Sequence, residues 1–180
     1  MQKLINFYKM TTVRFVSKIL FYLSRFLAIV YFWMATHSAI ALATGWSLLF
    51  KNDGKYFQIC YPFTQKSFLL GDYNLPYIIL DFLGPLSLYG LFFLLLSNVF
   101  KVFFQPKLFT EYGIKHLKRF YLANFLLPSL MVLLAVIFSI IDEGVFVLVL
   151  LHAILGIFAY FIAAIFQQGV QLQTEQDLII

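Results

Sequence analysis

Charged residues are scarce in this chain of 180 residues. Asp, Glu, Lys and Arg make up 12% of it, whereas a soluble domain averages about 25%. Hydrophobic residues make up 62%, and the mean hydropathy is +0.89. So few charges cannot cover the surface of a soluble domain of this size. The composition therefore indicates an integral membrane protein.

Cysteine is also scarce, since Cys60 is the only one. A single cysteine excludes an internal disulfide and a Cys-based metal cluster. It leaves open an intermolecular disulfide, if Cys60 faces an oxidising compartment. The sequence has no Gly-rich phosphate loop, no Gly-x-Ser-x-Gly nucleophile setting and no paired catalytic carboxylates. We therefore expect no catalytic, cofactor-binding or metal-binding residues and a protein that is not an enzyme.

Long apolar runs are what the chain has instead. A helix needs ~20 residues to cross the hydrocarbon core of a bilayer. Four such spans are predicted, and Pro85 and Pro128 mark kink sites in the second and third of them. The predicted spans are about 26–48, 77–99, 120–141 and 145–166. The sequence thus predicts an all-α membrane protein with one four-span domain, residues 1–180. A basic interfacial helix over Met1–Lys18 leads into the first span.

The first apolar run has an alternative interpretation, a secretory signal peptide cleaved after Ala41-Leu42-Ala43. That run is longer than the ~7–15 residues of a signal core, so a membrane span is favoured. Arg25 would then lie at the inner headgroups and Trp46 at the outer interface.

The polar segments fall between the spans. The external loop, residues 51–76, contains a tight-turn signal, Asn52-Asp53-Gly54, between β-forming stretches and predicts a small β-hairpin or short sheet. In the connector, residues 101–119, Pro106 ends a helix and Thr110 caps the next one. A short acidic turn at 142–144 joins the last two spans, and a polar tail occupies 167–180.

The charge distribution predicts the orientation. Ten of the thirteen Lys and Arg lie in the N-terminal segment and the connector, namely Lys3, Lys9, Arg14, Lys18, Arg25, Lys101, Lys107, Lys115, Lys118 and Arg119. The other three, Lys51, Lys55 and Lys66, lie in the external loop. Basic residues favour the cytoplasmic side, so both termini are predicted to be cytoplasmic. The net charge of +5 is explained in this way and does not indicate direct nucleic acid binding.

Two stretches carry a family resemblance. The connector contains PKLFTE at 106–111 and IKHLKR at 114–119, and the tail contains FQQGVQL at 166–172 and EQDLII at 175–180. This pattern resembles a bacterial integral-membrane family catalogued as domain of unknown function 2975. Gly113 stands where that family usually has Asn, and Ile179 where it usually has Thr. The resemblance implies four spans in the bacterial inner membrane and a small helix-turn-helix regulator as partner.

Polar residues within the spans are candidates for function, because burying them in a bilayer is costly. The candidate cluster is His37, Asp81 and His152. Asp81 and His152 lie ~6 Å and ~10 Å from the outer ends of their spans, so they could meet and relay a proton or hold a cation. The alternative is that each is a satisfied structural residue. Three such residues on three helices make no metal motif.

The connector and tail supply the other candidate residues, which are Thr110, Lys115, Lys118, Arg119, Glu175 and Asp177. The basic ones could contact anionic lipid, each worth ~1 kcal/mol, or dock a protein. We therefore predict a membrane sensor or anchor that binds a small helix-turn-helix regulator or another protein. The alternative is a small transporter or ion-handling protein, as a homo-oligomer, that uses the intramembrane cluster. An integral-membrane enzyme is the least supported.

Overall fold

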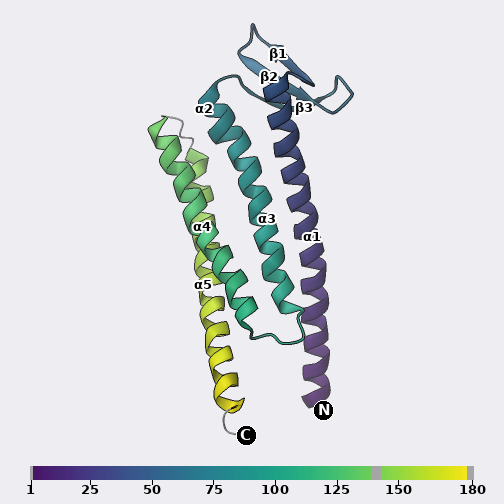
Figure 1. Ribbon diagram of the computed structural model, residues 1–180, viewed down its shortest axis with the longest axis vertical. Coiled ribbons are helices and arrows are strands. Elements are labelled where there is room, and N and C mark those ends of the chain that lie inside the picture. The colour runs from purple at the N-terminus through teal and green to yellow at the C-terminus, as the bar shows by residue number, and fades with distance from the viewer. Residues whose placement is uncertain (1, 139–142, 178–180) are drawn as a thin grey trace.

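The computed structural model describes residues 2–138 and 143–177, and most of them are helical. The elements in chain order are α1 (Gln2–Thr44), β1 (Leu48–Lys51), β2 (Tyr56–Cys60), β3 (Ser67–Asp72), α2 (Leu75–Tyr77), η1 (Ile78–Leu83), α3 (Gly84–Phe103), α4 (Glu111–Ile137) and α5 (Glu143–Asp177). The long helices run side by side, and the strands cover one end of them (Figure 1). We call this the sheet end, and the opposite end, where the α3–α4 loop lies, the loop end.

Within residues 2–138 and 143–177, four helical segments are long and apolar enough to cross a membrane, as the sequence predicts. They are Thr11–Thr44, Leu75–Phe103, Glu111–Ile137 and Val145–Asp177. Each exceeds the ~20 residues that a bilayer requires. The chain is therefore a multi-pass membrane protein by the length and composition of its helices.

The helices are longer than the predicted spans. The predicted interfacial segment is the first part of α1, and α5 continues through the polar tail to Asp177. The end of the third predicted span, Asp142 of the acidic turn and residues 178–180 lie outside the described residues. Helical propagation explains the extension, since the polar flanks contain good helix formers such as Gln and Lys.

The first helix ends at Thr44, before the predicted limit at residue 48. Gly45 has a positive φ of +75°, and its N–H donates to the Ala41 carbonyl at 2.9 Å. Glycine adopts this left-handed conformation without steric penalty and commonly ends helices in this way. Leu48, predicted to close the span, is instead the first residue of β1.

The external segment forms a three-stranded antiparallel sheet in the order β1-β2-β3. This sheet confirms the β structure that the sequence predicts for the external loop of an otherwise α-helical chain. The predicted turn is present between β1 and β2, where Asn52, Asp53 and Gly54 have φ of 48°, 52° and 87°. The third strand, β3, consists of Ser67–Asp72 and pairs with β2. Its Phe and Leu residues suit a strand that is half buried.

The sheet rests on the ends of the helices through an apolar cluster of Ala41, Phe57, Ile59 and Phe82. These four side chains are buried and come from α1, β2 and η1. The rings of Phe57 and Phe82 meet edge to face with centroids 5.0 Å apart. Apolar burial of this kind is the main force that attaches so small a sheet to a helix end.

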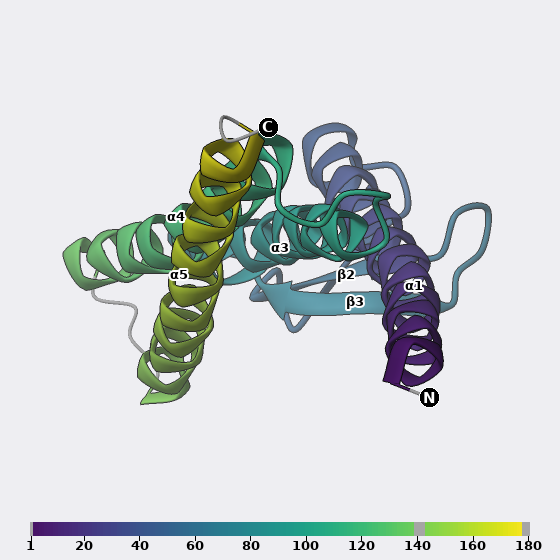
Figure 2. The same ribbon diagram turned by 90° about the horizontal axis from the view of Figure 1, so that it is seen from below.

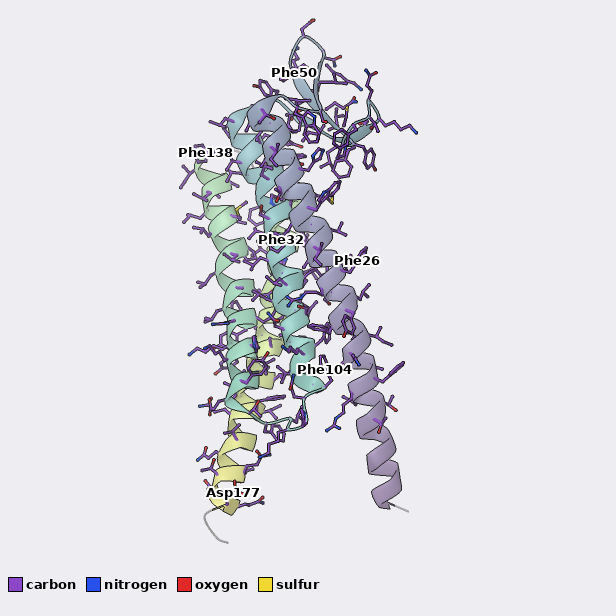
Figure 3. The ribbon with its side chains drawn as sticks, turned by 45° about the vertical axis from the view of Figure 1, so that its right-hand side comes forward. Phe26, Phe32, Phe50, Phe104, Phe138 and Asp177 are labelled. Carbon is purple, nitrogen blue, oxygen red and sulfur yellow. The ribbon has the colours of Figure 1, made fainter. Side chains whose placement is uncertain are left out.

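Over residues 11–44, the part of α1 whose side chains the structure describes, the buried positions are occupied mostly by small residues. They are Ser17, Ser24, Ala28, Ala35, His37, Ser38 and Ala41. Small side chains let helices approach closely in a bilayer, where association depends on van der Waals packing. The main helical partner of α1 is α3, and Phe32 lies between the two whereas Phe26 lies on the outer side of α1 (Figure 3). The outer face is suited to contact lipid.

At the loop end, α3, α4 and α5 share a second apolar core. Its buried members are Val99, Val102, Leu117, Phe120, Ala159, Ala163 and Phe166. Viewed along the helices, α3 lies between α1 on one side and the α4–α5 pair on the other (Figure 2). This arrangement places α3 at the centre of the helical layer.

Candidate functional site

A cavity lies between η1, α3, α4 and α5 in the sheet-end half of the helices. Its volume is about 780 Å³ when its open side is included. Most of its lining consists of Leu, Val, Ala, Phe, Met and Pro side chains. Four lining residues carry polar side chains: Asp81, Tyr89, Asn124 and His152. A mostly apolar cavity with a few polar groups is the usual character of a small-molecule site.

Proline shapes one wall of this cavity at η1. Pro85 has no N–H and would clash with the carbonyl four residues earlier, that of Asp81. The preceding segment is a π-helix, in which the Gly84 N–H donates to the Ile79 carbonyl five residues back. The sequence predicts a kink at Pro85, and the structure has this π-helix directly before it. Such turns are frequent at functional sites.

Proline acts on the opposite wall as well. Pro128 lies inside α4, is buried and lines the cavity. The residue four positions before it is Asn124, whose carbonyl therefore lacks the usual helical donor four residues later. Asp81 and Asn124, two of the four polar lining residues, thus each precede a proline by four positions.

The side chains of His152 and Asn124 are joined across α5 and α4. Nδ1 of His152 lies 2.8 Å from Oδ1 of Asn124, and Nδ2 of Asn124 donates to the Phe120 carbonyl at 2.8 Å. Because the amide nitrogen is engaged by a carbonyl, the amide oxygen faces the imidazole and accepts from it. Neutral His152 therefore carries its proton on Nδ1, and its Nε2 is a hydrogen-bond acceptor.

Aromatic rings of α3 surround the imidazole. The ring of His152 meets Phe92 edge to face at 5.2 Å and lies 6.2 Å from Tyr89. These contacts and the bond to Asn124 fix the ring on three helices. Among the described residues, Nε2 of His152 has no hydrogen-bond partner.

The structure separates the three residues of the predicted intramembrane cluster. Asp81 and His152 line the same cavity. His37 lies near the sheet instead, where its Nε2 is 3.0 Å from the Cys60 carbonyl and its ring stacks on Trp33 at 5.6 Å. Within residues 2–138 and 143–177, no group of three or more His, Cys, Asp and Glu is placed to hold a metal ion.

Sequence reasoning missed Tyr89 and the role of Asn124. The position of Asn124 four residues before Pro128 is a usable signal, because the amide and the free carbonyl then occur at one point of the helix. Tyr89 offers no comparable signal among the many aromatic residues of the spans.

The loop end holds the candidate docking residues. The Thr110 hydroxyl accepts from the Gly113 N–H at 3.1 Å and caps α4, as predicted, with Glu111 in its first turn. The basic residues Lys115, Lys118 and Arg119 are exposed on α4, on the side away from buried Leu117 and Phe120. We call these three the basic face.

Glu175 and Asp177 are exposed on the last turns of α5, and we call them the acidic end. Asp177 lies at the free end of α5, which extends past the α3–α4 loop (Figures 1 and 3). In the part of the chain that the structure describes, the acidic end makes no ion pair with the basic face. Charges of both signs are therefore available for other contacts.

The two stretches that carry the family resemblance pack against each other. The ring of Phe109 in the loop lies 5.2 Å from that of Phe166 in α5. A Cβ added at Gly169 would lie 2.6 Å from the Phe109 ring, and one added at Gly113 would lie 3.2 Å from Phe166. The loop is also tied to α1, since Arg14 donates to the Pro106 carbonyl at 3.2 Å.

Comparison with protein families agrees with this pattern. The family described as "Protein of unknown function (DUF2975)" matches residues 60–180. The chain belongs to the DUF2975 family. The part matched to DUF2975 contains the whole cavity lining, the basic face and the acidic end, and it leaves out α1 and β1. No curated protein and no solved structure matches the chain.

Proposed function

We propose that this DUF2975 protein is a non-enzymatic membrane sensor or anchor that binds a cytoplasmic protein at its loop end. One observation carries the proposal. The basic face and the acidic end stand exposed on α4 and α5, which pack on each other through a shared apolar core, and Phe109 just before α4 contacts Phe166 and Gly169 of α5. A rigid pair of helices with fixed charges of opposite sign is suited to recognise a partner whose surface carries the complementary pattern.

The orientation belongs to the proposal. The ten basic residues of the N-terminal segment and connector lie toward the loop end, and the three of the external loop lie toward the sheet end. This asymmetry supports a cytoplasmic loop end and an external sheet, in the inner membrane of a bacterium.

The acidic end distinguishes a protein partner from a lipid surface. Anionic headgroups would neutralise Lys115, Lys118 and Arg119, but they would repel Glu175 and Asp177. A protein can satisfy both sets at once. The family resemblance favours a small helix-turn-helix regulator as this protein, and in that arrangement the membrane protein itself does not contact nucleic acid.

A pull-down from detergent extract tests the docking. The wild-type chain is expected to recover the regulator, and recovery should be lost when Lys115, Lys118 and Arg119 are all changed to Glu, or when Glu175 and Asp177 are changed to Lys. The matched control reverses Lys51, Lys55 and Lys66, three exposed lysines at the sheet end. Recovery by both loop-end variants at the wild-type level would exclude docking at this surface.

A second candidate function is the handling of an ion or a small transported molecule, in an oligomer of the chain. The observation in its favour is that Asp81 and His152 line one cavity. Only four of the lining residues are polar, which disfavours a hydrated ion, because few groups could replace the water that the ion would lose. Flux into proteoliposomes that is lost in Asp81→Asn and His152→Ala would support it, and unchanged flux would exclude it.

A further inference from the structure

We propose that the cavity between α3, α4 and α5 binds a neutral apolar molecule that carries a hydroxyl group, with the hydroxyl donating to Nε2 of His152. A long-chain alcohol is the simplest compound of this class. The inference depends on the cavity alone, so it stands whether or not a protein docks at the loop end.

The apolar lining of the cavity favours a ligand whose main part is also apolar. Leu88, Leu127, Met131 and Val149 are among the side chains that enclose the space, and they come from three different helices. Apolar surfaces of this kind gain free energy in proportion to the ligand area that they cover. An alkyl or prenyl chain matches the lining, whereas a sugar or a peptide would leave its polar groups unpaired.

The polar groups of His152 and Asn124 determine the hydrogen-bonding group of the ligand. The tautomer of His152 is fixed by Asn124, so Nε2 offers a lone pair. Close by, Pro128 deprives the Asn124 carbonyl of its helical donor. His152 and Asn124 both line the cavity, and the ligand group that complements an acceptor there is a hydrogen-bond donor.

The depth of His152 in the bilayer favours a hydroxyl over an ammonium as the donor group of the ligand. His152 lies seven residues after Val145, the first residue of the span, which places it roughly 10 Å along the helix axis. A charged ammonium at such a depth carries a large penalty in a bilayer. Asp81, the one ionisable acid of the lining, lies nearer the sheet end. A hydroxyl donates to the same acceptor without a charge.

Photolabelling of the full chain in detergent micelles tests this proposal. The probes are a long-chain primary alcohol with a diazirine on its chain, its methyl ether and the corresponding primary amine, each at the same mole fraction of detergent. The labelled peptides are then mapped by mass spectrometry. We expect the alcohol to label the cavity segments of α3, α4 and α5, and the ether, which cannot donate, to label them about tenfold less.

Two pairs of variants separate the site from general surface labelling. His152→Phe should reduce labelling by the alcohol to the level of the ether, whereas His37→Phe, which alters a histidine outside the cavity lining, should leave it unchanged. Val149→Phe should block labelling by filling the cavity. Val147→Phe, on the exposed side of the same helix, should not.

Three outcomes would overturn the proposal. Equal labelling by the alcohol and the ether would show that no hydrogen bond selects the ligand. Retained labelling in both His152→Phe and Val149→Phe would place the probe elsewhere. Stronger labelling by the amine than by the alcohol, lost in Asp81→Asn, would make the cavity a cation site. None of these results depends on a cytoplasmic partner, so each is separable from failure of the pull-down.

Discussion

The ring of Phe109 occupies the space that a side chain at Gly169 would need. A Cβ at position 169 would lie 2.6 Å from Cγ of that ring, well inside the distance of ordinary contact. The loop between α3 and α4 is held against α5 at this point. The contact joins the two stretches that carry the family resemblance, so we infer that they form one structural unit.

Gly169→Ala should therefore loosen the loop end. We expect a loss of about 1–3 kcal/mol in the free energy of unfolding, the range for overpacking. Unfolding in mixed micelles measures it. Gln168→Ala, at an exposed neighbouring position, is the control. Adding Phe109→Ala should restore part of the loss by removing the clash, and an unstable double variant would contradict this explanation.

Thr110→Ala should weaken the start of α4. The hydroxyl of Thr110 is the partner of the Gly113 N–H, and loss of an N-cap typically costs about 1 kcal/mol. Proteolysis of the α3–α4 loop should become faster, and Thr110→Ser should retain the wild-type rate. Thr174→Ala is the matched control, because its hydroxyl only returns to the Val170 carbonyl within an exposed helix. Equal proteolysis of the alanine variant at position 110 and the wild type would show that the cap is dispensable.

The bond between Asn124 and His152 should appear as a coupling energy. Asn124→Leu leaves the Nδ1–H of His152 without its partner and should destabilise the chain by about 1–3 kcal/mol. His152→Phe should have a smaller effect in the Asn124→Leu background than in the wild type. The coupling expected from bonds between helices in membranes is about 0.6 kcal/mol and at most about 2. Strict additivity of the two changes would show that the bond contributes nothing.

Cysteine labelling tests the orientation. Cys60 is 2% exposed, so the wild-type chain should not react with an impermeant maleimide before it unfolds. In a Cys60→Ser background, Lys66→Cys at the sheet end should react in intact cells. Gln173→Cys near the end of α5 should react only after the membrane is permeabilised. The reverse pattern would place the loop end outside and would remove the basis for cytoplasmic docking.

Local signals in the sequence were sufficient for much of the fold. Apolar length predicted four helices able to span a membrane, and the left-handed preference of Asn52, Asp53 and Gly54 predicted the first turn of the sheet. Thr110 followed by an acidic residue predicted the start of α4. Each of these features depends on a few neighbouring residues.

The remainder depends on contacts between distant residues. Hydropathy could not show that α1 packs mainly on α3, because an apolar helix has no single face that identifies its neighbour. For the same reason His37 could not be assigned to the Cys60 carbonyl rather than to the other polar residues of the spans. In the cavity, depth placed Asp81 and His152 near each other, but only the packing of α4 against α5 made Asn124 the partner of His152.

The continuity of α1 has a mechanical consequence. Its 43 residues contain neither glycine nor proline, so no residue of the usual kind interrupts the helix along a length of about 65 Å. That length is about twice the thickness of the hydrocarbon core. His37 holds one end of this rod to the sheet. At the other end Arg14 donates to the Pro106 carbonyl, so a single uninterrupted helix connects the sheet on one side of the bilayer to the α3–α4 loop on the other.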